Sequence, residues 1–313
     1  ERFIQDGEIS LFSPHDVPGL YDAFGTDRFD DLYQSYERNE SVPRKTIGAQ
    51  KLILDILKER AETGRLYIMN IDHCNSHSSF KDKVNMSNLC QEITLPTDPI
   101  GHIDDEFGEI ALCILSAINV GKINGGDKEL EELCDLSVRG LEELIDYQEY
   151  PVVAAERATK ARRSLGVGFI GLAHYLAKLG FNYDSQQAWD AVHTLAESFQ
   201  YFLLKSSNQL AKEKGWCSEF GRTKYADGIL PLDTYKKDVD EITTRELQHD
   251  WDALRASINE FGLRHSTLSA QMPSESSSVV SNATNGIEPP RDYLSVKKSK
   301  KGPLKQIVPQ YGS

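Results

Sequence analysis

A cysteine with an amide two residues before it and a carboxylate two residues after it is a pattern that could do chemistry. It occurs in the stretch SNLCQEITLP, residues 87–96, where the three side chains belong to Asn88, Cys90 and Glu92. If this stretch is extended, alternate side chains share one face, so the three groups would project together. The alternative is a buried cysteine beside a turn asparagine and a surface glutamate, and periodicity alone leaves both open.

The carboxylate decides which sulfur chemistry the pattern favours. A nucleophilic cysteine needs its pKa lowered by cations or a helix N-terminus, whereas a neighbouring carboxylate keeps a thiol protonated. Cys90 is therefore predicted to be suited to chemistry of the S–H bond, such as hydrogen-atom transfer, rather than to thiolate attack. Cys113 lies inside the apolar run 109–121. Taken alone, it is predicted to be a buried packing residue. It becomes of interest if Cys90 is reactive, because a second thiol nearby could supply electrons.

A serine-rich segment, PSESSSVVSNATNGIEPP, covers residues 273–290. Pro273 and Ser274 can open a short helix with Ser276 and Ser277 in its first turn. Free backbone N–H groups and the positive end of the helix dipole make such a place an anion site, and serine hydroxyls add donors. The alternative is a serine-rich loop without a ligand.

The glycines of GVGFIG, Gly166, Gly168 and Gly171, match the dinucleotide-binding pattern, and Asp184 lies at about the expected distance. That pattern works in the turn between a hydrophobic strand and a helix. Here the preceding residues, ERATKARRSL, are a basic helical stretch. We therefore interpret the glycines as residues that let a helix pack tightly.

Three other residues, His73, Cys74 and His77, could be combined with Cys90 as zinc ligands. Structural zinc sites use paired ligands at regular spacing, and no second pair of this kind accompanies them. We therefore interpret these residues as core or loop residues that bind no metal.

Strands that alternate with helices predict an α/β fold with parallel strands. The apolar run 109–121 is typical of a strand buried on both faces. The other expected elements are helices over about 45–62, 128–147, 154–163, 169–179, 186–213 and 250–262, strands over 65–72 and 263–273, and a hairpin over 293–308.

Composition limits the function classes. The 313 residues carry a net charge of −13 and are 39% hydrophobic, which is enough for one large domain or two small ones. A diffusely acidic chain repels phosphate backbones and anionic membranes, and no apolar run is long enough to span a bilayer. Five irregularly spaced cysteines without a signal segment indicate a reducing cytoplasm rather than a disulfide framework.

Taken together and in order, SNLCQEITLPT, EIALCILSAIN, PSESSS and SNATNGIEPPR resemble the catalytic large (alpha) subunit of class I ribonucleotide reductase. The resemblance extends over the whole chain. It implies a ten-stranded α/β barrel of two half-barrels with a central finger loop that carries a radical cysteine. Residues 1–313 would then be one catalytic-domain fragment, about the second half of the barrel with its finger loop.

The resemblance also implies roles for residues. Cys90 would carry a transient thiyl radical that abstracts the ribose 3′ hydrogen, and Glu92 would take the 3′-hydroxyl proton. Asn88 would orient the substrate, and Cys113 would be one member of the cysteine pair that reduces the 2′ position. The implied substrate-binding residues are Asn88, Leu89, Cys90, Gln91 and Glu92 in the finger loop and Pro273, Ser274, Glu275, Ser276 and Ser277 in the loop that holds the diphosphate.

The implied activity is reduction of ribonucleoside diphosphates to deoxyribonucleoside diphosphates. The chain itself would bind no metal or cofactor. The radical would come from a dimetal/tyrosyl small (beta) subunit, electrons from thioredoxin or glutaredoxin, and regulation from ATP and dATP on a region absent from this sequence. The large subunits would form a homodimer in the cytoplasm, with no nucleic-acid or membrane partner.

The family has sequence before the residue matching Glu1, including the allosteric sites and the second redox cysteine, and after Ser313, including a tyrosine pair. We therefore expect no turnover from this chain alone. Two alternatives remain open at this point. One is a nicotinamide-dependent dehydrogenase that uses Gly166, Gly168 and Gly171, and the other is a non-catalytic fragment that complements a second chain.

Overall fold

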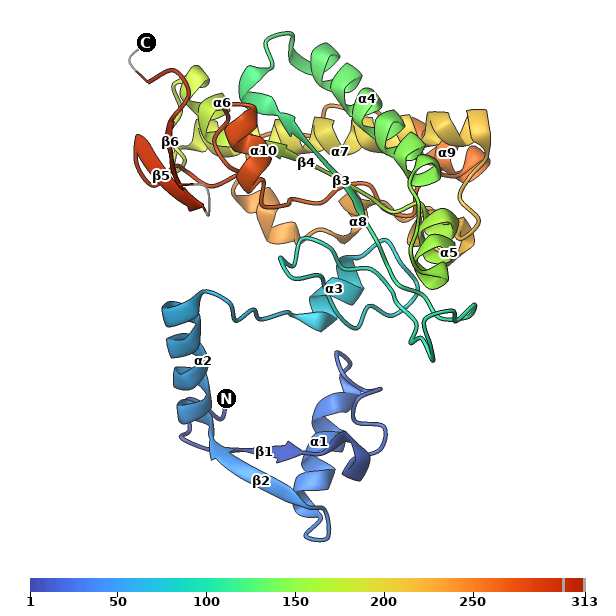
Figure 1. The fold of residues 1–313 in the computed structure, drawn as a ribbon, viewed down its shortest axis with the longest axis vertical. Coiled ribbons are helices and arrows are strands. Elements are labelled where there is room, and N and C mark those ends of the chain that lie inside the picture. The colour runs from blue at the N-terminus through green and yellow to red at the C-terminus, as the bar shows by residue number, and fades with distance from the viewer. Residues whose placement is uncertain (300–301, 312–313) are drawn as a thin grey trace. The chain divides into compact units, whose positions relative to one another are not determined.

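The computed structural model describes residues 1–299 and 302–311, with the backbone alone described for 297–299. The backbone divides into two compact units, Glu1–Ser78 and Ser79–Ser313, and each is considered by itself (Figure 1). Both contain helices and strands, and the second contains a parallel strand pair, which confirms the α/β class. None of the helices in the described ranges combines the length and apolarity needed to cross a membrane.

The first unit is built around one antiparallel strand pair. Its elements are β1 (Glu8–Phe12), η1 (Pro14–Asp16), α1 (Arg28–Arg38), β2 (Arg44–Gly48), α2 (Ala49–Thr63) and α3 (Ile71–His77). The hydroxyl of Tyr33 on α1 donates to the carbonyl of Ser10 at 2.7 Å and accepts from its N–H at 2.8 Å. Since Ser10 lies in the middle of β1, these two bonds hold α1 against the strand pair.

Two sequence predictions fall in this unit. The helix over 45–62 is confirmed as α2, which ends at Gly64 in a left-handed conformation that glycine adopts without steric cost. The strand over 65–72 is wrong, because α3 begins at Ile71 and the residues before it are irregular. Ile68 is exposed and only Ile71, the first residue of α3, is buried, so the alternation expected of a half-buried strand is absent.

The second unit holds most of the helices. Its elements are β3 (Ile114–Asn119), η2 (Val120–Lys122), α4 (Gly126–Tyr147), α5 (Val153–Arg162), β4 (Leu165–Ile170), α6 (Leu172–Leu179), α7 (Gln186–Lys214), η3 (Phe220–Arg222), η4 (Lys224–Asp227), α8 (Pro231–Thr234), η5 (Lys237–Glu241), α9 (Trp251–Phe261), α10 (Glu275–Val280), β5 (Leu294–Ser299) and β6 (Gly302–Ile307). The expected helices over 128–147, 154–163, 186–213 and 250–262 are confirmed. The one expected over 169–179 begins three residues later, because 169 and 170 belong to β4.

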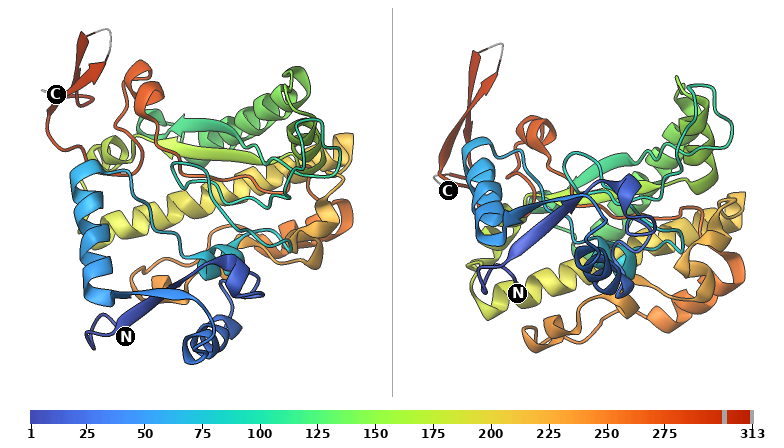
Figure 2. Two further views of the ribbon diagram at one scale, coloured as in Figure 1. Left: turned by 60° about the horizontal axis from the view of Figure 1, so that its bottom comes forward. Right: turned by 90° about the horizontal axis from the view of Figure 1, so that it is seen from below.

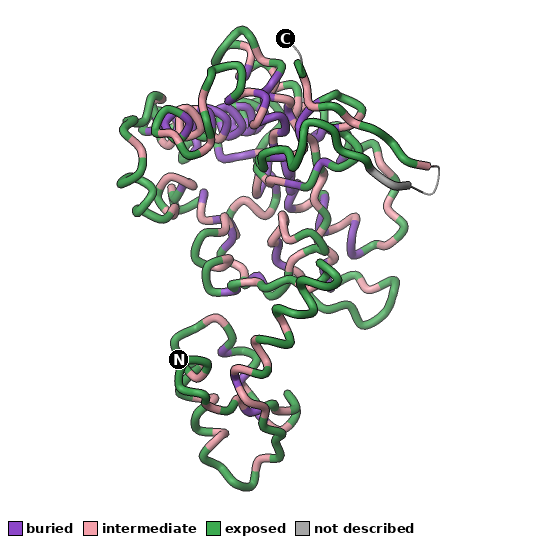
Figure 3. The backbone as a smooth tube through the Cα atoms, turned by 90° about the vertical axis from the view of Figure 1, so that its left-hand side faces the viewer, coloured by how far each residue is buried: buried purple, intermediate pink, exposed green. Residues whose placement is uncertain are grey.

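Helix α4 shows why these residues pack as they do. Its buried side chains Leu130, Cys134, Val138, Leu141 and Ile145 recur every three or four residues, which places them on one stripe of the helix. This stripe packs against β3 and against α7, which runs alongside it (Figure 2). The buried residues of the second unit gather along α7, as the purple segments of Figure 3 show. Cys134 is thus a packing residue of the core.

A parallel pair forms the centre of the second unit. β3 and β4 pair with Ile114 opposite Leu165, and α4 and α5 lie between them in sequence, as parallel connections require. A third segment runs beside β4 in the same direction, with one bridge between Val167 and Ser269. The strand expected over 263–273 is thus present as an irregular extended segment. Hereafter residues 263–273 are called the third segment.

The glycines of GVGFIG do not let a helix pack, so that interpretation is wrong. Gly166 and Gly168 lie in β4, where neighbouring segments come very close, and Gly171 is the N-cap of α6. A Cβ atom at Gly166 would lie 2.8 Å from the sulfur of Cys113, and one at Gly168 would lie 2.4 Å from the carbonyl oxygen of Ala270. The dinucleotide pattern needs its glycines in the turn after the strand, and two of these three are inside the strand.

A buried carboxylate joins α4 to the start of β4 and to the third segment. Glu142 is fully buried and accepts hydrogen bonds from Arg163 and Arg264 at 2.7 Å each, and it contacts His265 at 3.0 Å. Although burial opposes the charged form, the hydrogen bonds from His265 and the two arginines hold the pKa of Glu142 below its usual range. The carboxylate is therefore ionised and fixes three chain segments at one point.

The strands within the described residues form three two-stranded sheets, β1 with β2, β3 with β4 and β5 with β6. The hairpin over 293–308 is confirmed by the last pair, and its turn residues 300–301 lie outside the described residues. The ten-stranded barrel is not seen in these ranges and stays a prediction, as does the assignment of 1–313 to a single domain fragment.

We expect Glu142→Gln to lower the free energy of unfolding by about 3 kcal/mol, because it leaves the buried Arg163 and the partly buried Arg264 without their shared anion. Glu131→Gln on the same helix is the control, since Glu131 pairs with Lys205 at the surface and should change stability by about 0.5 kcal/mol or less. Urea denaturation measures both. Equal effects of the two substitutions would contradict the role given to Glu142.

Candidate active site

Cys90 lies in a tight turn, so the prediction of an extended stretch with alternating faces is wrong. The N–H of Gln91 donates to the carbonyl of Asn88 at 3.2 Å, and the N–H of Asn88 donates to the carbonyl of Ile93 at 3.3 Å. Gln91 has a φ of 61°, a left-handed conformation that residues other than glycine adopt mainly in turns. Cys90 is exposed in this turn.

The side chain of Asn88 explains why the stretch turns. Its Oδ1 accepts a hydrogen bond from the N–H of Ile93 at 3.2 Å, and such local side-chain bonds compete with extended structure. The Nδ2 group is not used in this bond and is available to donate to a ligand. Leu89 is exposed and Gln91 half-buried in the same turn.

Glu92 and Cys113 lie close to each other. Burial, and then the Glu92 carboxylate, raise the pKa of the Cys113 thiol to about 12. The Oε2 atom of Glu92 is itself buried and has no hydrogen-bond partner among the described residues. An unpaired buried acceptor is costly, so this oxygen marks a place where a ligand hydroxyl could donate. Cys113 is a protonated thiol at neutral pH.

The serine-rich segment forms the short helix α10, as expected. Ser274 is its N-cap residue and is buried, but its hydroxyl has no partner among the described residues. Its N–H donates to the side chain of Asn285 at 3.0 Å. Pro273, Glu275, Ser276 and Ser277 are exposed around this helix start. The arrangement presents donors without cations, as an anion site at a helix start does.

The third segment connects the thiols to α10. The sulfur of Cys113 and the side chain of Ala270 both lie within about 3 Å of a Cβ built on Gly166, at 2.8 and 3.0 Å. From Ala270, Ser274 is four residues further, a span of at most about 14 Å in an extended chain. These lengths keep Ser274 within about 20 Å of the sulfur of Cys113.

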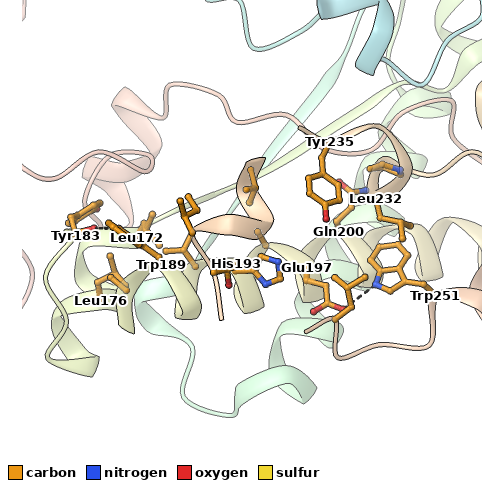
Figure 4. A pocket seen from close by; sticks show the side chains of 18 residues that line it. Leu172, Leu176, Tyr183, Trp189, His193, Glu197, Gln200, Leu232, Tyr235 and Trp251 are labelled. Atoms are coloured by element: carbon orange, nitrogen blue, oxygen red, sulfur yellow. Dashed lines mark hydrogen bonds between the residues drawn. The ribbon is translucent and has the colours of Figure 1, made fainter. Parts of the chain in front are cut away.

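A separate cavity of about 530 Å³ lies along α7 (Figure 4). Its lining is mainly apolar and comes from α6, α7 and the stretch 231–251, and it includes none of the predicted site residues. Glu197 in its wall accepts a hydrogen bond from the indole of Trp251 at 3.1 Å. Sequence analysis missed this cavity because its walls come from stretches far apart in the chain.

His73, Cys74 and His77, which were considered as zinc ligands, lie on α3 in the first unit. Within the described ranges no group of three histidine, cysteine or acidic side chains is placed to hold a metal ion.

Residues 1–311 match the ribonucleotide reductase barrel domain. The chain belongs to this family, which confirms the resemblance noted in its motifs.

The particular relatives are alpha subunits of ribonucleoside-diphosphate reductase. The chain is 57% identical to that of Haemophilus influenzae over 316 residues, which is 99% of this chain and 42% of the relative. It is 55% identical to that of Escherichia coli and 44% identical to that of Enterobacteria phage T4, each over 99% of this chain and 41% of the relative. The chain therefore spans about two fifths of the length of the curated relatives it matches.

Replacing Glu92 with Gln should lower the pKa of the Cys113 thiol, because the substitution removes a nearby negative charge that disfavours the thiolate. A lower pKa means more thiolate, so alkylation of Cys113 by iodoacetamide at pH 9 should become faster. Mass spectrometry of peptides follows each cysteine separately. Cys134 is the internal control, since burial likewise raises its pKa to about 12 but its nearby acids are Glu131 and Asp135. An unchanged ratio of the two rates would show that Glu92 does not act on Cys113.

Proposed function

We propose that this chain is the catalytic region of a ribonucleoside-diphosphate reductase alpha subunit and works by thiyl-radical chemistry. The names of its relatives support the reaction class. The observation that carries the assignment to this site is the effect of the Glu92 carboxylate, two residues beyond Cys90, which together with burial raises the pKa of the Cys113 thiol. One carboxylate then serves both a reacting sugar and a reducing thiol.

Cys90, as a thiyl radical, would abstract the 3′ hydrogen atom of the ribose and become a thiol, and later give the hydrogen back. An exposed sulfur in a turn suits this exchange, because it can approach a sugar without moving a helix or strand. Glu92 would take the 3′-hydroxyl proton through its unpaired Oε2. Asn88, held by the bond to Ile93, would donate from Nδ2 to a ribose hydroxyl.

Cys113 would supply one of the two thiols that reduce the 2′ position. Its raised pKa keeps the sulfur protonated, so it can deliver a hydrogen together with an electron. The second thiol of the pair would come from the region of the subunit that the relatives have outside the matched segment. The same region would hold the ATP and dATP effector sites and the other part of a ten-stranded barrel.

The diphosphate of the substrate would bind at the start of α10. The buried, unpaired hydroxyl of Ser274 and the N–H groups of Ser276 and Ser277 in the first turn would donate to its oxygens. The third segment links this anion site to the surroundings of Cys113, and a sugar with its 5′-diphosphate would lie between the two. Pro273 and Ser276 complete the loop.

The partners follow from the family. A small beta subunit with a dimetal/tyrosyl centre would generate the radical, thioredoxin or glutaredoxin would return electrons, and two alpha subunits would form a homodimer in the cytoplasm. The dehydrogenase alternative has no observation in its favour. Gly168 is explained by packing, because the carbonyl of Ala270 lies in the space that a larger residue would need.

The other alternative is a fragment that complements a second chain without taking part in catalysis. The following experiment distinguishes it from the proposed catalytic region.

The test is a chimaeric Haemophilus influenzae alpha subunit in which this chain replaces the matched segment, assayed with its beta subunit for deoxyribonucleoside diphosphates. We expect activity in the chimaera and none from this chain alone. Cys90→Ser should lower turnover by at least about 10³-fold, because the reacting group is gone. Cys134→Ser, a change at a packing cysteine, should cost no more than a few-fold.

Deoxyribonucleotide formation by the Cys90→Ser chimaera at the rate of the parent would refute the proposal and favour the complementing fragment. Tight NADP binding that Gly168→Ala abolishes would instead favour the dehydrogenase.

A further inference from the structure

The segment that carries Cys90 is held at both ends by one arginine. Residues 83–108 contain no helix and no strand, so regular structure does not fix their course. Asp82 stands immediately before this segment and Glu109 immediately after it. The guanidinium of Arg162, the last residue of α5, donates to both carboxylates.

The contacts are short and largely buried. Arg162 donates to Asp82 at 3.0 Å and to one oxygen of Glu109 at 2.8 and 3.1 Å. Arg162 is 2% exposed and Glu109 4% exposed. A planar guanidinium offers several donors in a fixed geometry and can satisfy two acids at once, which a lysine cannot do equally well.

Neighbouring groups support both ends. Arg222 donates to the other oxygen of Asp82 at 2.9 and 3.1 Å. The N–H of Glu109 donates to the carbonyl of Asp98 at 2.9 Å, and the N–H of Asp98 donates back at 3.2 Å. The carbonyl of Arg162 accepts from Ser266 at 3.0 Å, so the same residue is also bonded to the third segment.

We infer that Arg162 is a positioning residue that fixes both ends of the Cys90 segment relative to β4 and the third segment. This inference rests on the proposed function in one respect, that Cys90 is the reacting thiol. Asp82, Arg162 and Glu109 together are called the clamp. Without the clamp the two ends of a long irregular segment are held less firmly, and Glu92 loses its fixed place near Cys113.

The first test measures hydrogen exchange in the chain itself. In Arg162→Met the amides of Asp98 and Glu109 should exchange at least about tenfold faster, while amides in the middle of α7 exchange as in the parent. Arg163→Met is the matched control. Arg163 is the adjacent buried arginine, but its acids are Glu142 and Asp146 on α4. It should lower stability without raising exchange at Asp98 and Glu109 relative to α7.

Uniformly faster exchange in Arg162→Met, including α7, would overturn the inference, because it would show a general loss of stability. Unchanged exchange at Asp98 and Glu109 would overturn it as well. Should Arg162→Met fail to fold, Glu109→Gln releases one end of the segment with almost no change of shape and is judged by the exchange of the Asp98 amide.

The second test uses the chimaeric subunit. Arg162→Met should lower kcat about 100-fold, as expected for a reacting group displaced by about 1 Å, and leave KM for the diphosphate substrate within about twofold, since the clamp does not include α10. Arg162→Lys should recover part of the loss through one ion pair. Equal changes of kcat and KM, or none, would overturn the inference. An inactive parent chimaera would refute the proposed function instead, and the exchange experiment would still decide whether the clamp exists.

Discussion

Two adjacent buried arginines at the end of α5 are the constraint on which the rest of the second unit depends. Arg163 adopts a left-handed conformation with a φ of 48° and contacts Glu142 on α4. Arg162 contacts Asp82 and Glu109 at the two ends of the Cys90 segment. Arg162 and Arg163 thereby join the helical scaffold to the irregular segment that carries Cys90. Removing either partner of such buried pairs leaves a charge without compensation, so neither arginine is easily replaced.

The parallel strands transmit this constraint to the candidate site. β4 begins two residues after Arg163, and Gly166 and Gly168 leave room on one face of it for both the sulfur of Cys113 and Ala270. The third segment then leads to Ser274 at the start of α10. Cys113, Glu92 and the start of α10 are therefore positioned by elements connected to the same two arginines, which is how an irregular segment could carry the chemical role proposed for it.

Local sequence signals predicted the elements whose cause is local. The stripe of α4, with Leu130, Val138 and Ile145 on one side, is visible in the spacing alone, and the serines at 274–277 indicated a helix start. The turn at Cys90 was not predicted, because it depends on one side-chain bond from Asn88 to Ile93 and on the left-handed conformation of Gln91. The purpose of Gly166 and Gly168 depends on strands that pack against them from elsewhere in the chain. The clamp joins residues 80 and 53 positions apart, and no pattern in the sequence connects them.

The central claim is that Cys90, Glu92 and Cys113 surround one sugar whose diphosphate lies at α10. A crystal structure of the chimaeric alpha subunit with a bound ribonucleoside diphosphate tests it most directly. We predict phosphate density at the Ser274 hydroxyl and a ribose whose 3′ oxygen lies within hydrogen-bonding distance of Glu92, with the sulfur of Cys90 facing the 3′ carbon. A nucleotide bound with its ribose against other residues, or with Cys90 turned away from the sugar, would contradict the account.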